Sequence, residues 1–152
     1  MSLMDDAQQM VKVGIRDDDG QVETLWATPI DQHLYRLENS PFRAYGISWL
    51  DMVRAEADND GVLFFVSIAK KSGHRTIRVI VEKDSNIVPT LLSQLKSLGC
   101  TCEGAFSRLI VINVPPEVEL HQVADYLIST ELQWEYADPT YEEVASEQNK
   151  KG

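Results

Sequence analysis

The spacing of apolar residues changes near Gly73. Before that glycine, short stretches alternate between apolar and polar positions, which is typical of strands with one buried face. Asp and Gly clusters at 17–20 and 59–61 interrupt the alternation and predict hairpin turns. After Gly73, alternating runs are separated by two runs in which apolar residues recur every three or four positions. We therefore expect an α+β protein made of two units that meet near this residue.

The first unit, residues 10–73, predicts a small antiparallel β-barrel. Five short strands in about 60 residues are too few for a β-sandwich and suit a small, strongly twisted barrel. The expected strands lie at 10–16, 22–30, 34–37 and, as a hairpin, within 51–69.

The second unit, residues 74–138, has the order strand, helix, strand, strand, helix, strand. This order predicts a ferredoxin-like β-α-β-β-α-β sandwich with both helices on one face of an antiparallel sheet. It resembles regulatory ligand-binding modules of the ACT type in topology, and that topology hosts many unrelated functions. Residues 1–9 are expected to be disordered, and residues 139–152 to form a polar tail that is frayed or loosely helical.

The charge of the chain narrows the classes of partner. The formal net charge is −10 over 152 residues. A protein that neutralises phosphates needs a basic face, so we expect neither nucleic-acid nor anionic-membrane binding. No apolar run approaches the ~20 residues that span a bilayer, and acidic residues stand where a secretory signal carries positive charge. We therefore expect a cytoplasmic protein.

A loop rich in aromatic residues leads to a candidate ligand site. Asn39 begins a turn, and Phe42 and Tyr45 follow within a few positions. Such a loop is either an exposed recognition surface or a lid packed over the barrel end. Asp51 could tether it through backbone hydrogen bonds. At the junction of the units, "SGHRT" supplies two further polar side chains, His74 and Arg75.

These six residues predict a cleft between the two units that binds a small anionic ligand, with His74 and Arg75 donating hydrogen bonds. His74 is also the best candidate for an acid or base if the protein is an enzyme, working with Asp51 or Ser48. However, the sequence lacks a nucleophile elbow, a phosphate-binding loop, a dinucleotide fingerprint and a zinc-helix motif. We therefore expect no catalytic residues, and we favour binding over catalysis.

Metal and cofactor binding are not expected. Cys100 and Cys102 are the only cysteines, and no second pair completes a zinc site. The acidic turn up to Gly61 imitates the start of a calcium loop, but Ser67 stands where a bidentate Glu is required. Turn chemistry explains this cluster instead.

Three stretches resemble a known group of proteins. They are "VETLWATPID", "YRLENSPFRAYGISWLDMVRAE" and "SGHRTIRVIVE". Together they resemble small bacterial proteins catalogued only as a domain of unknown function, over about residues 10 to 137. The resemblance implies a bacterial, free-standing protein of this size, and it supplies no activity or catalytic residue.

Two other kinds of partner stay open. The acidic exterior could dock on a basic protein, as an immunity protein or antitoxin masks a toxin. An open sheet edge could also support a homodimer.

Overall fold

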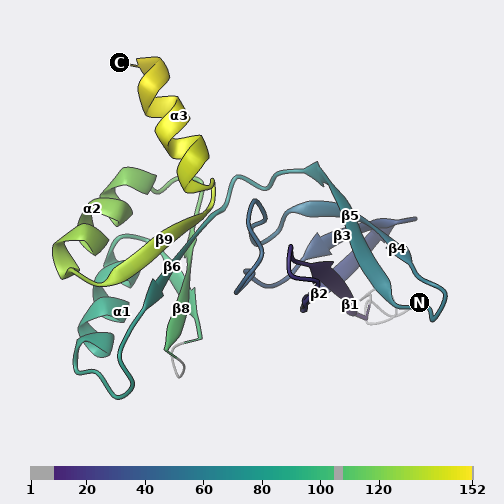
Figure 1. The fold of residues 1–152 in the computed structure, drawn as a ribbon, viewed down its shortest axis with the longest axis horizontal. Coiled ribbons are helices and arrows are strands. Elements are labelled where there is room, and N and C mark those ends of the chain that lie inside the picture. The colour runs from purple at the N-terminus through teal and green to yellow at the C-terminus, as the bar shows by residue number, and fades with distance from the viewer. Residues whose placement is uncertain (1–8, 105–107, 152) are drawn as a thin grey trace, which may run out of the picture.

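A computed structural model describes residues 9–104 and 108–151, which form two units side by side, each with its own apolar core (Figure 1). The predicted disorder at residues 1–9 falls, apart from Gln9, outside the described residues. The first unit contains β1 (Val11–Arg16), β2 (Val22–Asp31), β3 (Leu34–Leu37), β4 (Met52–Ala57) and β5 (Leu63–Lys70). The second contains β6 (Arg75–Ile80), α1 (Ile87–Ser97), β7 (Thr101–Glu103), β8 (Leu109–Val114), α2 (Leu120–Thr130), β9 (Gln133–Asp138) and α3 (Tyr141–Lys151).

The first unit is a closed barrel in which each strand pairs with the next along the chain. Alternate residues such as Val13, Leu25 and Val53 are fully or almost fully buried in its interior, as the period of a strand requires. The turn between β1 and β2 is built by Asp17, whose Oδ1 accepts the backbone N–H of Asp19 at 3.0 Å and of Gln21 at 2.9 Å. This Asx-type turn is what the Asp-rich sequence predicts.

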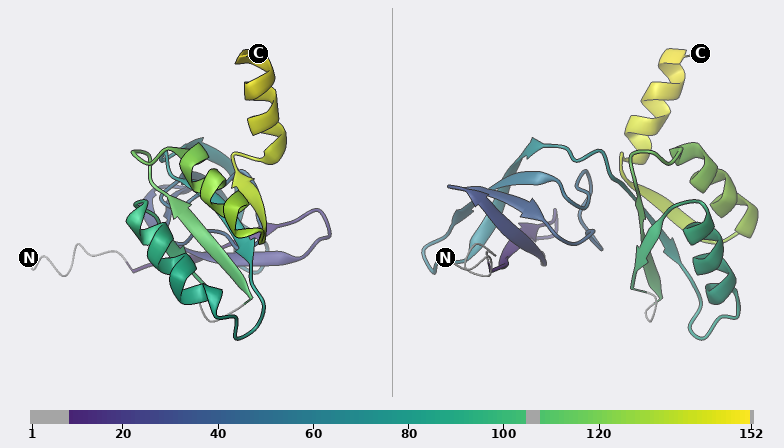
Figure 2. Two further views of the ribbon diagram at one scale, coloured as in Figure 1. Left: turned by 90° about the vertical axis from the view of Figure 1, so that its left-hand side faces the viewer. Right: turned by 180° about the vertical axis from the view of Figure 1, so that it is seen from behind.

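The second unit is a four-stranded sheet in the order β7-β8-β6-β9, with antiparallel pairing throughout. Its core lies between the sheet and the apolar stripes of α1 and α2, which include Leu91, Leu95, Val123 and Leu127. Both helices lie on the sheet face that points away from the barrel (Figure 2). The opposite sheet face is therefore left to receive the first unit.

The predicted fold class, a small antiparallel β-barrel followed by a ferredoxin-like β-α-β-β-α-β sandwich, is corrected by the structure in both parts. The barrel is not wholly antiparallel, because β1 and β5 pair in parallel through Val13 with Leu63 and Gly14 with Phe64. Parity explains this: when five strands alternate in direction, the first and last run the same way. The second unit does not end at its fourth strand, because α3 follows β9.

The regular helix α3 arises from a capping motif at its start. The backbone N–H of Glu143 donates to Thr140 Oγ1 at 3.3 Å, and Glu143 Oε1 accepts the backbone N–H of Thr140 at 3.0 Å. This reciprocal pair is a capping box, and it satisfies two donors at the helix start. The expected polar tail is therefore a helix that projects from the body of the molecule (Figures 1 and 2). Each helix in residues 9–104 and 108–151 is too short or too polar to cross a membrane.

Candidate functional site

A long loop between β3 and β4, residues 38–51, lies between the two units, and we call it the strap. Its shape is set from the barrel side by Glu23 on β2. The Glu23 carboxylate accepts the backbone N–H groups of Phe42, of Arg43 at 3.1 Å and of Ala44 at 2.9 Å. Three successive N–H groups converging on one carboxylate form a backbone anion nest. The strap is therefore held through its main chain.

Arg78 on β6 holds the same part of the strap from the sheet side. Its side chain is 2 % exposed, and its guanidinium donates to the carbonyls of Pro41 at 3.3 Å and Ala44 at 3.0 Å. Nε donates to Glu135 Oε1 on β9 at 3.2 Å, and the Tyr45 ring stacks 4.7 Å from the guanidinium carbon. A buried guanidinium is stable only with such partners. Arg78 therefore joins the strap to the centre of the sheet.

The strap also contacts both edges of the sheet. Near its start, the backbone N–H of Ser40 donates to Glu103 Oε2 on β7 at 3.2 Å. Burial raises the pKa of the Glu103 carboxyl above its ordinary value, although hydrogen bonds from Ser40 and Asn39 oppose that shift. Further along, the backbone N–H of Gly46 donates to the carbonyl of Ala137 on β9 at 2.8 Å. One loop thus contacts three of the four strands of this sheet.

A cluster around Lys71, which we call the clasp, fixes the end of the strap. Lys71 Nζ donates to Asp51 Oδ2 at 2.6 Å, to Asp138 Oδ2 and to the carbonyl of Gly46 at 3.1 Å. Ser48 Oγ donates to the same Asp138 oxygen at 2.6 Å and lies 2.7 Å from Thr76 Oγ1. The clasp therefore connects the strap, the linker between the units, β6 and the end of β9.

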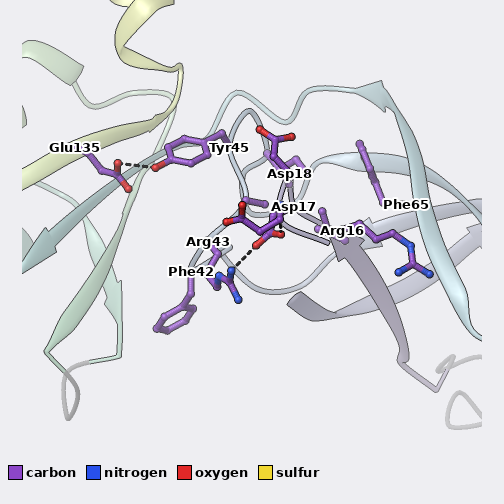
Figure 3. A pocket seen from close by; sticks show the side chains of 12 residues that line it. Arg16, Asp17, Asp18, Phe42, Arg43, Tyr45, Phe65 and Glu135 are labelled. Atoms are coloured by element: carbon purple, nitrogen blue, oxygen red, sulfur yellow. Dashed lines mark hydrogen bonds and ion pairs between the residues drawn. The ribbon is translucent and has the colours of Figure 1, made fainter. Parts of the chain in front are cut away.

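A cavity of about 580 Å³ lies beside the strap, between the barrel and β9. Figure 3 shows Tyr45 and Phe42 at this cavity, with Glu135 reaching toward Tyr45 from β9 and the Asp17–Asp18 turn on the barrel side. We call this cavity the cleft. It is lined by Ile15, Arg16, Asp17, Asp18, Asp19, Phe42, Arg43, Ala44, Tyr45, Ile47, Phe65 and Glu135.

Three of the six charged side chains that line the cleft, Asp17, Arg43 and Glu135, form ion pairs within the protein. Arg43 forms an ion pair with Asp17, and Glu135 accepts from the buried Arg78 and, at 2.7 Å, from the Tyr45 hydroxyl. The Glu135 hydrogen bond and charge raise the pKa of Tyr45 above its ordinary value, so Tyr45 stays a hydrogen-bond donor at neutral pH. The lining contains four carboxylates against two guanidiniums, which makes it more negative than positive.

Two of the six residues proposed from the sequence, Phe42 and Tyr45, line the cleft. The other polar residues of the loop have structural partners instead. Asn39 Oδ1 accepts the backbone N–H of Trp26 at 2.9 Å. Asp51 is fully buried in the clasp, where it tethers the loop as expected from its backbone partners Ser48 and Ser72.

His74 and Arg75 also lie away from the cleft. The His74 ring packs edge-on against Trp49, with centroids 4.9 Å apart, and its Nδ1 lies 3.0 Å from Asn113 Oδ1. Arg75 donates to the carbonyls of Pro115 at 2.6 Å and of Val118. It borders a different cavity, of about 480 Å³, beside α2 and α3. The six residues therefore do not converge on one site.

The residues of the cleft that the sequence reading missed are the turn 17–19 and Glu135. The turn was interpreted as a hairpin connection alone. Arg78 carried a usable signal, because it lies on the strand face that alternates away from Ile77 and Val79 and so away from the helices. A charged residue on that face is expected to meet either solvent or a second polar surface, and here the strap carbonyls of Pro41 and Ala44 form that surface.

The cysteines show no features of a reactive or metal site. Burial raises the pKa of Cys100 to about 11 and that of Cys102 to about 12, so both thiols are protonated at neutral pH. Within the described residues, no group of three or more His, Cys, Asp or Glu side chains is arranged to hold a metal ion.

The chain is similar to a known protein family and to a solved structure. A family model described as Domain of unknown function (DUF4265) matches residues 23–136, from β2 to β9. The structure is similar to a crystal structure of a hypothetical protein from Neisseria gonorrhoeae, with a TM-score of 0.70 and 18% sequence identity. The alignment covers 88% of this chain and 98% of that chain. At this identity the similarity shows a common fold. No curated protein matches the chain.

Proposed function

This chain belongs to the family described as Domain of unknown function (DUF4265), and we propose that it is a non-catalytic binding module whose ligand lies in the cleft. The observation that carries this proposal is a cavity of about 580 Å³ walled by both units. Pockets for small molecules commonly have volumes of roughly 300 to 1,000 Å³ and lie between structural units.

The cleft has features of a preformed binding site. The strap supplies Phe42, Arg43, Ala44, Tyr45 and Ile47 to its lining, and Glu23, Arg78 and Lys71 hold the strap by hydrogen bonds. A preformed site binds without the entropic cost of ordering a loop. Among the acid–base side chains of the lining, Asp17, Tyr45 and Glu135 are engaged with one another or with arginines of the protein. These features favour binding over chemistry.

The lining favours a neutral or cationic aromatic ligand over the anionic ligand expected from the sequence. That expectation depended on His74 and Arg75, which do not reach the cleft. The charges cancel within two ion pairs, Asp17 with Arg43 and Glu135 with Arg78. The remaining charged residues of the lining are Asp18, Asp19 and Arg16, whose net charge is negative. Phe42, Tyr45 and Phe65 offer aromatic surface for packing.

The proposal can be tested with three small aromatic probes that share a ring and differ in charge: benzamidinium, benzamide and benzoate. In NMR titrations, we expect benzamidinium to shift the backbone signals of Tyr45 and Arg43 and benzoate to leave them unchanged. The absence of saturable shifts for all three probes at millimolar concentration would contradict the proposal.

Matched turn variants locate the binding. Asp18→Asn removes a carboxylate from the cleft, whereas Asp60→Asn removes one from the turn between β4 and β5, which is not part of the lining. We expect weaker benzamidinium binding for Asp18→Asn and unchanged binding for Asp60→Asn. Equal weakening by both variants would indicate a general effect of net charge rather than a ligand in the cleft.

We also propose a cytoplasmic location. Cys100 and Cys102 are both free thiols, which is the usual state in a reducing compartment. Cell fractionation that places the protein outside the cytoplasm would contradict this.

A further inference from the structure

The peptide unit at Gly46 connects the clasp to the cleft. Its neighbours in the chain, Tyr45 and Ile47, both line the cleft. Its N–H donates to the carbonyl of Ala137 at 2.8 Å, and its carbonyl accepts from Lys71 Nζ at 3.1 Å. Gly46 has a φ of +77°, a conformation that other residues rarely adopt. The strap therefore turns at this point under restraints from both sides.

Lys71 also contacts residues that continue from both walls of the cleft. Asp51 follows the part of the strap that lines the cleft, and Asp138 follows Glu135 on β9, the wall on the opposite side. One ammonium thus joins the two walls at their ends. Because the Asp51 side chain is fully buried and that of Asp138 is 10 % exposed, neither carboxylate can be freely rehydrated if the ammonium is removed.

We infer that Lys71 is a positioning residue for the cleft: it pins the Gly46 carbonyl and draws the strap and β9 together, and so orients Tyr45 toward Glu135. This inference rests on the proposed function for its relevance to a ligand. Lys71 itself does not line the cleft. Its substitution therefore changes the shape of the cleft without removing any lining side chain.

The test compares Lys71→Met with Lys70→Met, which removes the neighbouring lysine at the exposed end of β5. The first measurement is amide hydrogen exchange by NMR. Loss of a charge-assisted hydrogen bond network typically raises local opening on the order of tenfold or more. We expect this acceleration at Gly46 in Lys71→Met, with little change in the ladder between β1 and β2. Lys70→Met should leave both unchanged.

The pattern of exchange separates positioning from general stability. A purely structural role would accelerate all slowly exchanging amides together, because global unfolding exposes them all. Unchanged exchange at Gly46, or an equal acceleration across both units, would overturn the inference. A second readout is the ring signals of Tyr45, which should shift in Lys71→Met as the ring loses its fixed place beside Arg78 and Glu135.

Titration with benzamidinium links the inference to the proposed function. We expect Lys71→Met to raise the dissociation constant severalfold and Lys70→Met to leave it unchanged. If benzamidinium does not bind the unaltered protein, the proposed function fails, whereas the exchange result at Gly46 still decides the inference. If it binds the unaltered protein and Lys71→Met equally well, the inference fails and the proposed function stands.

Discussion

The side chain of Arg78 is almost completely buried, yet it carries a full charge. The edges of its planar guanidinium donate hydrogen bonds to two strap carbonyls and to Glu135. One face of the same group stacks on the Tyr45 ring. Lysine could not supply this arrangement, because its ammonium is a compact point charge without a planar fork. The contact between the units therefore requires an arginine, and not merely a positive charge, at position 78.

We expect Arg78→Met to lower the free energy of unfolding by about 2 to 3 kcal/mol, because two buried carbonyls and one carboxylate lose their donor. Arg54→Met, at an exposed position of β4, should change it by less than about 0.5 kcal/mol. Urea denaturation of both variants measures the difference. Equal stabilities for the two variants would show that Arg78 is dispensable to the fold.

Gly14 leaves room for the side chains of Phe64 and Val22 on the neighbouring strands. A Cβ atom there would lie 3.0 Å from Phe64 Cε1 and 3.1 Å from Val22 Cγ1, so the Phe64 ring, which crosses the glycine, would have to move. We expect Gly14→Ala to lower the free energy of unfolding by about 1 to 3 kcal/mol through overpacking.

A second substitution tests this explanation. Phe64→Leu should remove part of the clash. The double variant Gly14→Ala/Phe64→Leu should therefore lose less free energy of unfolding than the two single variants lose in sum. Strict additivity in thermal or urea unfolding would contradict the packing account.

Tyr45 makes the stability of the contact between the units decrease at high pH. Its pKa is raised, chiefly by the hydrogen bond to Glu135, so the folded protein holds this proton more tightly than the unfolded chain. The resulting stability is fully present below the ordinary tyrosine pKa of about 10, and it is lost as pH rises through the folded value. Glu135→Gln should lower the pKa of Tyr45 in an ultraviolet titration. An unchanged titration curve would disprove this pairing.

Among the helices and strands, α3 begins at a short capping motif that was visible in the sequence. Its apolar content is low, yet the sequence Thr140-Tyr-Glu-Glu143 has the spacing of a capping box. This signal was available in the sequence, but the polar composition of the tail outweighed it in the prediction. The strands and the other two helices have buried faces with a clear period, which is why their positions could be predicted.

We expect Thr140→Ala to destabilise α3 by about 1 kcal/mol through the lost cap. Ser146→Ala changes a hydroxyl on the exposed side of the same helix and serves as the control. Hydrogen exchange of the first α3 amides should accelerate in Thr140→Ala and not in Ser146→Ala. Equal protection in both would mean that the cap does not hold the helix.

The barrel shows a different limit of prediction at the element scale. Alternation indicated its strands correctly, but alternation reports which side chains are buried and not which strands are neighbours. The parallel contact of Gly14 with Phe64 follows from the number of strands, once the barrel is known to be closed. The description as wholly antiparallel overlooked that requirement.

At the scale of the whole molecule, the candidate site could be predicted only in part. The aromatic loop was identified from its sequence, and the structure places Phe42 and Tyr45 in the cleft. Glu135 lies 90 positions from Tyr45, and its contact depends on how the units dock. His74 and Arg75 are neighbours of the junction in sequence, but they are engaged by Asn113 and Pro115 on the second unit.

Partners of the whole molecule stay as predictions. Docking of the acidic exterior on a basic toxin predicts a toxin gene next to the gene for this protein, and an isolated locus would weaken it. Homodimerisation is consistent with the position of β9 at a sheet edge. Sedimentation equilibrium at micromolar concentration would reveal a dimer, and a monomer mass of 17.2 kDa would exclude it under those conditions.

Glu23 holds the strap through three successive backbone N–H groups and contacts none of the strap side chains by these hydrogen bonds. Any non-proline residue supplies the same N–H, so the three hydrogen bonds to Glu23 do not depend on which side chains stand at positions 42 to 44. The Glu23 carboxylate thereby fixes the course of this turn, and the side chains at positions 42 to 44 form part of the lining of the cleft.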